Sequence, residues 1–399
     1  MVTTSLVDLG NQPLSNAYID RPAANRPELT YPLHPMVCEQ CFLVQIGVFQ
    51  APAEIFSDYA YFSSYSTSWL EHGRRYVECA ISRLELSQRS FVVETASNDG
   101  YLLKQFVERG ICVLGIEPAA NVALEAIAGG VPTRIAFFGA QEAEKVRAES
   151  GPADLMIANN VLAHVPDIHD FVEGFRRLLA PNGVATFEFP HLLPLLAETQ
   201  FDTIYHEHFS YLSLLAVEPI FEAHDLRLID VERLPTHGGS LRLWVALRNS
   251  RFDTSPSVDQ LRHVERDARL RDIHTYRSFA ARVQRIKRDL LRFLLDAFEA
   301  EESVAAYGAA AKGNTLLNYC GIRNDLISCV ADRNPHKQGR YLPGSHIPVV
   351  SPQRLAESRP KYVLIMPWNL KTEIVEQISE EVTSWGGQLA VAIPELTIL

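Results

Sequence analysis

The feature that most constrains the fold is an alternation of strand-like and helix-like segments that occurs twice along the chain. In the first part, apolar strands are expected at 91–94, 113–117, 154–158 and 183–189. Helical patterns separate them at 102–109, 119–128 and 168–179. In the second part, strands are expected at 303–308, 327–332, 362–366 and 388–393. Such alternation is typical of doubly wound parallel sheets, so the sequence predicts an α/β protein with two sheets in tandem.

The remaining segments divide the chain into three domains. Residues 1–66 are rich in proline and turns, which predicts a small irregular domain without long helices. A helix is expected at 67–87, and residues 67–250 form the second domain. Residues 251–399 comprise a helical linker and the second sheet. The linker carries one apolar stripe, Phe279, Val283, Ile286, Leu290, Leu294 and Phe298. Its ten Lys and Arg between 262 and 292 are interpreted as a solvated face.

Composition excludes several classes of partner. The 399 residues carry a formal net charge of −11, which argues against nonspecific binding to nucleic acid or anionic membrane. No apolar run is long enough to span a membrane, and the first residues lack a signal peptide, so a cytoplasmic protein is expected. Four of the six cysteines, Cys79, Cys112, Cys320 and Cys329, are expected to be reduced core residues.

An acidic turn follows the first strand of the first sheet. The strand ends at Glu94, and the turn runs through Ala96, Ser97, Asn98, Asp99 and Gly100. A dinucleotide site would need the motif G-x-G-x-x-G to bind its pyrophosphate, whereas this turn has only one glycine and carries acidic side chains. It suits a ligand with a positive sulfonium or amine. The next strand ends in Glu117-Pro118, where the carboxylate can accept hydrogen bonds from both hydroxyls of a ribose. This pair of acids resembles class I S-adenosylmethionine (SAM) methyltransferases; a purely structural turn is the alternative.

Polar residues also follow the next strand of this sheet. Asn159 and Asn160 are expected beside the cofactor, because the carboxyl ends of parallel strands share one edge. His164 follows them, as a functional group or as a structural loop histidine.

The stretch from Thr203 to Tyr211, T-I-Y-H-E-H-F-S-Y, concentrates proton-transfer groups. It holds two histidines, a glutamate and two tyrosines within nine residues. The segment indicates acid–base chemistry, although a buried polar network that holds domains together would have the same composition.

Five segments together resemble one family. They are D-L-G-N-Q-P-L-S-N (8–16), Y-F-S-S-Y-S (61–66), A-S-N-D-G (96–100), Y-H-E-H-F-S-Y (205–211) and G-A-A-A-K-G-N-T (308–315). Their order and content are similar to the SAM-dependent C-methyltransferases that act on dTDP-4-keto-deoxysugars for antibiotics, such as those of the tetronitrose and mycarose pathways. The resemblance implies a zinc-binding-like N-terminal domain, a central class I SAM-methyltransferase sheet and a C-terminal Rossmann-like domain that helps hold the sugar nucleotide.

The resemblance also implies the chemistry. A 4-keto group acidifies the neighbouring C–H, commonly at C-3, and the resulting enolate takes the methyl group of SAM. His208 matches the base of the family's Y-x-E-H pattern. Tyr205 is expected to bond the keto oxygen, Glu207 to orient an imidazole or bind the sugar, and His164 to assist the enolate. His206 is assigned a structural role.

Substrate contacts are expected from several segments. Tyr61 and Tyr65 would reach over the site or plug the domain boundary, and His237 would line the pocket or make a turn. Lys312 and Asn314, at a helix N-terminus, are expected to bind the diphosphate with Asp332 beside them. A structural turn with a solvated lysine is the alternative.

Zinc is the one point of departure from the family. Cys38 and Cys41 form a C-x-x-C pair, but the family's other pair lies ahead of the Asp8 segment and is absent from this chain. A structural zinc needs four ligands. Either the start of the chain is misassigned or the domain has lost its metal.

Two other functions stay open at this point. One is an NAD-linked sugar-nucleotide oxidoreductase, against which the missing G-x-G-x-x-G counts. The other is a non-catalytic sugar-nucleotide-binding protein. In each case the partner is a small molecule, and the chain is expected to be a monomer or a weak oligomer.

Overall fold

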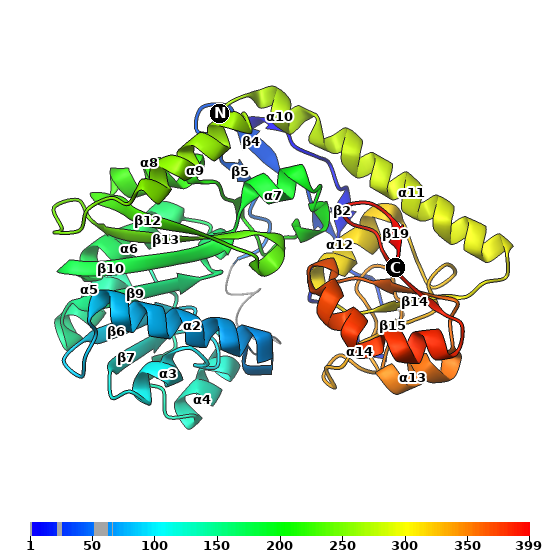
Figure 1. The fold of residues 1–399 in the computed structure, drawn as a ribbon, viewed down its shortest axis with the longest axis horizontal. Coiled ribbons are helices and arrows are strands. Elements are labelled where there is room, and N and C mark those ends of the chain that lie inside the picture. Colours follow the sequence, from blue (N-terminus) through cyan, green and yellow to red (C-terminus); the bar gives the residue numbers. More distant parts are fainter. Residues whose placement is uncertain (1, 22–25, 52–62, 66) are drawn as a thin grey trace.

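A seven-stranded sheet forms the centre of the protein. The structure, a computed structural model, describes residues 2–21, 26–51, 63–65 and 67–399; of residues 2, 3, 65, 67 and 68 it describes the backbone alone. The sheet has the order β12-β13-β10-β9-β6-β7-β8 (Figure 1). The strands are β6 (Phe91–Thr95), β7 (Cys112–Ile116), β8 (Thr133–Arg134), β9 (Ala153–Asn159), β10 (Leu179–Pro190), β12 (Leu226–Leu234) and β13 (Ser240–Leu247).

The prediction of parallel strands is confirmed for β6, β7, β9 and β10, and the sheet also contains β13, which was not among the strands predicted for it. β13 runs antiparallel to both β10 and β12. Only five residues, 235–239, connect β12 to β13. So short a connection can join only antiparallel strands, whereas a parallel pair needs a long crossover.

Helices cover both faces of this sheet. On one face Val92 of β6 packs with α2 (Thr67–Leu84), α3 (Leu103–Val107) and α4 (Ala120–Ala128). On the other, Val93 packs with α5 (Ala140–Ser150), α6 (Ile168–Leu178), α8 (Leu214–Ala223) and α9 (Pro256–Asp267). Neighbouring residues of one strand therefore serve opposite cores, which is why these strands are apolar throughout.

A second sheet lies in the C-terminal part, with the order β16-β15-β14-β17-β18-β19. It contains β14 (Val304–Tyr307), β15 (Val330–Ala331), β16 (Val349–Val350), β17 (Tyr362–Ile365), β18 (Gln388–Val391) and β19 (Thr397–Ile398). All are parallel to their neighbours except β19. The helices are α12 (Ala311–Cys320), α13 (Pro352–Ser358) and α14 (Lys371–Ser384). The expected second α/β sheet is thus present.

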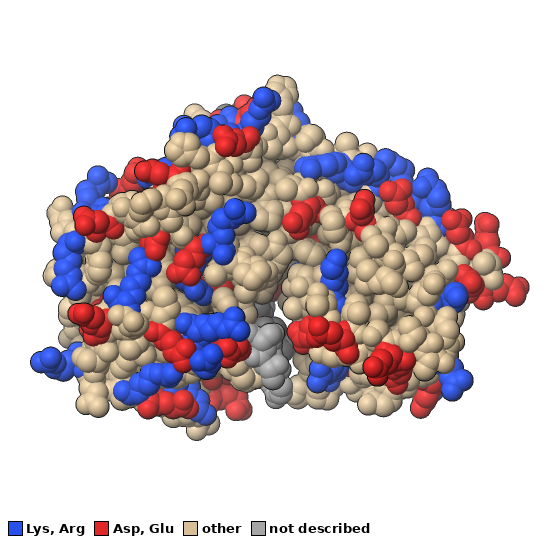
Figure 2. Space-filling view, in the orientation of Figure 1, with Lys and Arg blue, Asp and Glu red and all other residues tan. Residues whose placement is uncertain are grey.

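The linker comprises α10 (Ile273–Arg277) and the long α11 (Phe279–Glu299), which runs along the C-terminal sheet domain (Figure 1). The predicted stripe is buried along α11 except for Phe298, which is 63% exposed. Ala297 is buried in its place at the end of the helix. Figure 2 shows Lys and Arg gathered along the outer side of α11, as a solvated face requires.

The described residues of the N-terminal part form short strands and a 3-10 helix, η2 (Ser63–Tyr65), and no long helix, as the proline content predicts. β1 (Val2–Ser5), β4 (Met36–Cys38) and β5 (Val44–Gln45) form an antiparallel sheet whose last strand is β11 (Ser210–Tyr211). A smaller ribbon pairs β2 (Asn11–Gln12) with β3 (Tyr31–Pro32). Because β11 ends the proton-transfer stretch, that stretch is built into the N-terminal sheet.

The cysteines are free thiols, and the expectation for two of them is wrong. Cys320 and Cys329 are buried, but Cys79 and Cys112 are exposed. Cys79 lies on the outer side of α2, and Cys112 is the first residue of β7, ahead of its buried part. In the described part of the chain, no helix has the length and apolarity that crossing a membrane would require.

Candidate active site

The tight turn after β6 contains several residues whose backbone is in the left-handed conformation. Ala96 has φ 53°, Asn98 has φ 52° and Gly100 has φ 76°. Gly100 also needs the absence of a side chain, because a Cβ there would lie 3.0 Å from Val131 and 3.1 Å from Ala126. Left-handed non-glycine residues are strained and gather at ligand sites.

Glu117, predicted as the ribose ligand, closes this turn. Its Oε2 accepts the backbone N–H of Asn98 at 2.9 Å, and its Oε1 accepts that of Ala119 at 2.9 Å. Burial raises the pKa of Glu117, and these two hydrogen bonds oppose the rise. Each oxygen retains a lone pair for a further donor.

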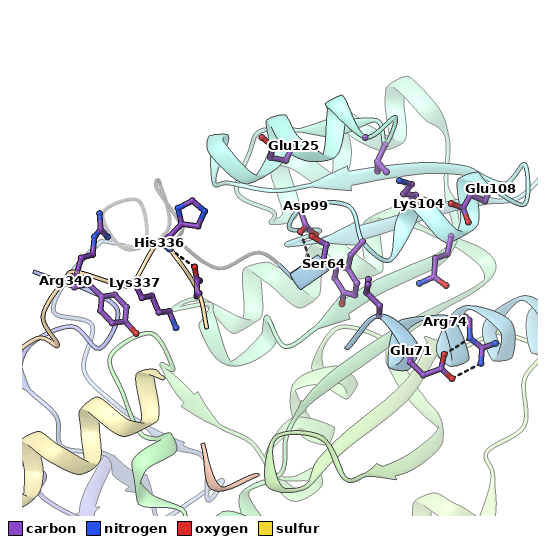
Figure 3. A pocket seen from close by; sticks show the side chains of 17 residues that line it. Ser64, Glu71, Arg74, Asp99, Lys104, Glu108, Glu125, His336, Lys337 and Arg340 are labelled. Atoms are coloured by element: carbon purple, nitrogen blue, oxygen red, sulfur yellow. Dashed lines mark hydrogen bonds and ion pairs between the residues drawn. The ribbon is translucent and has the colours of Figure 1, made fainter. Parts of the chain in front are cut away.

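Asn98 and Asp99 hold the chain that enters the domain. Asn98 Oδ1 accepts the backbone N–H of Ser63 at 2.9 Å. Asp99 Oδ2 accepts that of Ser64 at 3.0 Å, and Figure 3 shows these two residues side by side. The sequence assigned both side chains to the cofactor alone; this second contact was missed. Tyr61 and the side chain of Tyr65 lie outside the described residues.

Buried polar atoms around the turn fit a polar ligand. Those with no hydrogen-bond partner among the described residues include Glu94 Oε2, Ser97 Oγ, Asp99 Oδ1, Asn159 Oδ1 and both side-chain polar atoms of Asn160. Burial, together with the charges of Glu117 and Asp99, raises the pKa of Glu94 well above its usual range. Unsatisfied buried polar atoms are costly. A cofactor with an amine, a carboxylate and ribose hydroxyls would satisfy them, as SAM has.

His208 lies in a buried aromatic cluster at the same edge of the sheet. Its ring is 4.1 Å from the ring of Tyr205 and 4.7 Å from that of His164, which follows β9. Its Nδ1 bonds to the carbonyl oxygen of Thr203 at 3.0 Å. Burial holds the pKa of His208 well below 6.5, and the charge of His164 lowers it further. The imidazole is therefore neutral near pH 7 and able to accept a proton.

Glu207 and His206 point to the N-terminal domain. Asn16 Nδ2 donates to Glu207 Oε1 at 2.6 Å. Burial raises the pKa of Glu207 to about 7, against the lowering effect of that bond. His206 Nε2 bonds to the carbonyl oxygen of Tyr31 at 3.2 Å and its ring packs edge-on against Tyr31, which fits its structural assignment.

The C-terminal domain holds the other end of the stretch. Trp368 Nε1 donates to Asp202 Oδ2 at 2.8 Å, and Thr315 Oγ1 donates to the carbonyl oxygen of Ile204 at 2.9 Å. Burial raises the pKa of Asp202 to about 6. Sequence reasoning missed Asn16, Asp202 and Trp368. Trp368 had one signal, since it follows the carboxyl end of a predicted strand.

The predicted substrate residues separate into two groups. Asp332 accepts the backbone N–H groups of Ala309 at 2.7 Å and Asn334 at 2.8 Å, and Asn314 Nδ2 donates to the carbonyl oxygen of Ser15 at 2.6 Å. These two residues shape loops and join domains.

His237 and Lys312 belong with the aromatic cluster instead. Burial lowers the pKa of His237 to about 4, and the charge of Lys312 lowers it further. His237 is left-handed at φ 55°, and its ring lies 5.3 Å from that of Trp69. Lys312 is not solvated as the structural alternative required: its Nζ donates to Asn369 Oδ1 at 2.6 Å beside the ring of Trp368.

A cleft of about 1100 Å³ opens beside the cofactor turn. Ser64, Asp99 and Tyr101 line it on the side of the central sheet. Lys337 and Arg340 line it on the side of the C-terminal domain, and Figure 3 shows them across the cleft from Asp99. The cleft gives a ligand access between two domains.

The cysteine pair does not complete a zinc site with the described residues. Hydrogen bonding from the Cys41 backbone lowers the pKa of Cys38, whereas burial raises the pKa of Cys41. Within the described ranges no group of three or more His, Cys, Asp or Glu is placed to hold a metal. Two thiolates alone do not fit a four-ligand zinc.

Three family models match consecutive parts of the chain. A "putative zinc binding domain" covers residues 2–56, a methyltransferase domain covers 69–231, and a C-methyltransferase C-terminal domain covers 235–394.

A relative matches along almost the whole chain. The C-methyltransferase NovU of Streptomyces niveus is 36% identical over 394 residues, covering 99% of this chain and 94% of its own. Among solved structures, magnesium protoporphyrin IX methyltransferase of Synechocystis PCC 6803 with bound SAH is 16% identical, covering 44% of this chain and 82% of its own, with a TM-score of 0.35. The PH0226 protein of Pyrococcus horikoshii OT3 is 14% identical, covering 50% and 99%, with a TM-score of 0.39.

The identity to NovU extends through all three matched segments, and the site joins an acidic cofactor turn to a buried neutral histidine. The chain belongs to the family of SAM-dependent C-methyltransferases.

Proposed function

We propose that the substrate is a dTDP-4-keto-deoxysugar and that the methylated carbon is C-3, next to the ketone. The observation that carries this proposal is the state of His208: a buried, neutral imidazole with Nδ1 held by Thr203 and Nε2 without a partner among the described residues. C-methylation needs a nucleophilic carbon, and a saturated sugar has none. A 4-keto group supplies one after a base removes the neighbouring proton.

His208 Nε2 takes that proton in the proposed reaction. The C–H electron pair becomes the new C=C bond, and the carbonyl π pair moves onto oxygen. The rings of Tyr205 and His164, centred 4.1 Å and 4.7 Å from the ring of His208, border the space in which this charge develops. SAM, when bound, supplies an electrophilic methyl group to the enolate carbon. The residues that would hold it are Glu94, Ser97, Glu117, Asn159 and Asn160.

The cleft supports a nucleotide-linked substrate. Its volume of about 1100 Å³ suits a ligand of sugar-nucleotide size. Lys337 and Arg340 lie on its C-terminal wall, where Lys337 pairs with Asp332 at 3.8 Å and Arg340 with Asp20 at 2.9 Å. Their remaining N–H donors can bind an anionic diphosphate.

Mass spectrometry tests the proposal. The protein is incubated with SAM and a panel of dTDP-4-keto-deoxysugars, each beside its 4-hydroxy counterpart. We expect one keto sugar to gain the mass of one methylene group, bound at C-3 by NMR, and its 4-hydroxy counterpart to stay unchanged. Methylation of the 4-hydroxy sugar, or of no sugar by a folded protein that binds SAM, would refute it.

A further inference from the structure

Lys312 is a half-buried cation that has no anionic partner among the described residues. It lies in the first turn of α12, where its Nζ donates to Asn369 Oδ1 at 2.6 Å and sits 4.9 Å from the centre of the Trp368 ring. Among the described residues no carboxylate lies within ion-pair distance of it. An ammonium group has three N–H donors, and one is used here. A buried charge is costly unless it is paired, so the two remaining donors require an anionic or strongly polar ligand.

The segments around Lys312 connect this ammonium to the aromatic cluster that contains His208. One turn along α12, Thr315 bonds to the carbonyl oxygen of Ile204, four residues before His208. Trp368, which stacks on Lys312, bonds to Asp202. Trp368 also packs against Gly238, where a Cβ would lie 2.4 Å from the ring. Lys312 is thus enclosed by the loops that carry His208 and His237.

Electrostatics agree with this placement. Burial lowers the pKa of Lys312, and the charge of Asp202 opposes the fall. The positive charge of Lys312 is in turn among the causes that lower the pKa values of His208 and His237, after burial. The charge of the ammonium therefore acts on both imidazoles.

A diphosphate is a poor ligand for this position. It carries at least two negative charges and needs several donors or water, whereas the contacts of Lys312 are one indole ring and one amide, and the carboxyl of Asp202 is near enough to affect its pKa. The open cleft, with Lys337 and Arg340, can take a hydrated diphosphate. A single negative charge that develops during the reaction matches one half-buried ammonium.

We propose that Lys312 is a catalytic residue that donates a hydrogen bond to the 4-keto oxygen and stabilises the enolate while His208 removes the neighbouring proton. This inference rests on the proposed function and deepens it. The proton moves from carbon to His208 Nε2, and the negative charge that appears on oxygen faces the ammonium. This role for Lys312 replaces the diphosphate contact that the sequence analysis expected of it.

Enolisation and nucleotide binding can be measured separately. With S-adenosylhomocysteine bound, in D₂O, exchange of the proton next to the ketone reports enolisation without methyl transfer. The sugar used is the panel member that the wild-type enzyme methylates. Binding of dTDP alone, by calorimetry, reports the diphosphate contact. We expect Lys312→Met to slow exchange and kcat about 10²–10³-fold, the range for loss of one oxyanion donor. Lys312→Arg should recover part of the rate, and dTDP affinity should change less than about twofold.

Lys287→Met is the matched control. Like Lys312, Lys287 donates to a neutral oxygen, the carbonyl of Tyr319 at 2.5 Å, and lies over an aromatic ring, that of Tyr319. It belongs to α11 and not to the segments around His208. It should leave exchange, kcat and dTDP binding unchanged.

Two results would overturn the inference while leaving the proposed function intact. One is wild-type exchange by Lys312→Met. The other is loss of dTDP affinity by Lys312→Met with a normal kcat at saturating sugar, which would make Lys312 a diphosphate anchor. Absence of both exchange and methylation in the wild-type enzyme would instead reject the proposed function.

Discussion

The Nδ1 atom of His208 lies 3.0 Å from the carbonyl oxygen of Thr203, five residues earlier in the chain. A carbonyl only accepts hydrogen bonds, so this contact selects the tautomer with the proton on Nδ1 and the lone pair on Nε2. Thr203 lies between two residues that the C-terminal domain holds, Asp202 and Ile204. The orientation of the base is therefore coupled to the docking of a third domain.

Removal of the Asn160 side chain should weaken cofactor binding without harming the fold. Its side-chain polar atoms are buried and lack hydrogen-bond partners among the described residues, and its backbone is left-handed at φ 54°. Asn160→Gly removes the amide and tolerates that backbone. Calorimetry should show about tenfold weaker SAM binding, or about 1.4 kcal/mol. Asp225→Gly, at φ 53° on the surface, should leave SAM affinity unchanged. Equal affinities for both variants would exclude Asn160 from the cofactor site.

Glu207 should make stability depend on pH. Its pKa of about 7 in the folded protein, against 4.5 for a free side chain, means that the folded state keeps a proton that the unfolded chain loses. The resulting stabilisation is complete below pH 4.5 and disappears as pH rises through about 7. Relative to Glu207→Gln, wild type should lose roughly 3 kcal/mol of unfolding free energy across this window. Urea unfolding over the pH series measures it, with surface Glu299→Gln as the control. If the difference in unfolding free energy between wild type and Glu207→Gln stays constant with pH, the pKa of Glu207 is not raised in the folded protein.

Gly238 should be less tolerant of alanine than another glycine with a similar positive φ. At Gly238, with φ 87°, a Cβ would lie 2.4 Å from the Trp368 ring and 2.9 Å from Gln200 Nε2. At Gly151, with φ 85°, it would meet nothing within 4 Å. Gly151→Ala should cost about 1–3 kcal/mol of backbone strain, because its φ of 85° and ψ of −176° lie in a region that is essentially confined to glycine. Gly238→Ala should cost about 1–3 kcal/mol more and slow methyl transfer, because Trp368 must move. Unfolding curves and kcat for both variants test this prediction. Equal losses of unfolding free energy in the two variants would show that Trp368 can move aside without cost and would contradict it.

Local sequence pattern was sufficient for the two sheets and for part of the site. Apolar runs such as 91–94 and 154–158 became β6 and β9 because their residues pack against helices on both faces. The carboxyl ends of parallel strands meet at one edge, so the turn after Glu94 and the segment after Asn159 could be placed together in advance. The antiparallel β13 was not anticipated, although its five-residue connection to β12 was readable as a hairpin.

The contacts that complete the site are remote in sequence. Asn16 and Glu207 are 191 residues apart, and Asp202 and Trp368 are 166 apart. No periodicity or turn chemistry encodes such pairs, because they depend on how three separately folded parts dock. The burial that shifts the pKa values of His208, Glu207 and Lys312 is a consequence of the same docking.

Deuterium exchange at the carbon next to the ketone, compared between wild type and His208→Asn with S-adenosylhomocysteine bound, tests the central claim most directly. We expect wild type to exchange this proton and His208→Asn to exchange it about 10²–10⁴-fold more slowly, with unchanged binding of the sugar nucleotide. Exchange at the wild-type rate by a folded His208→Asn variant would show that another group removes the proton and would contradict the account.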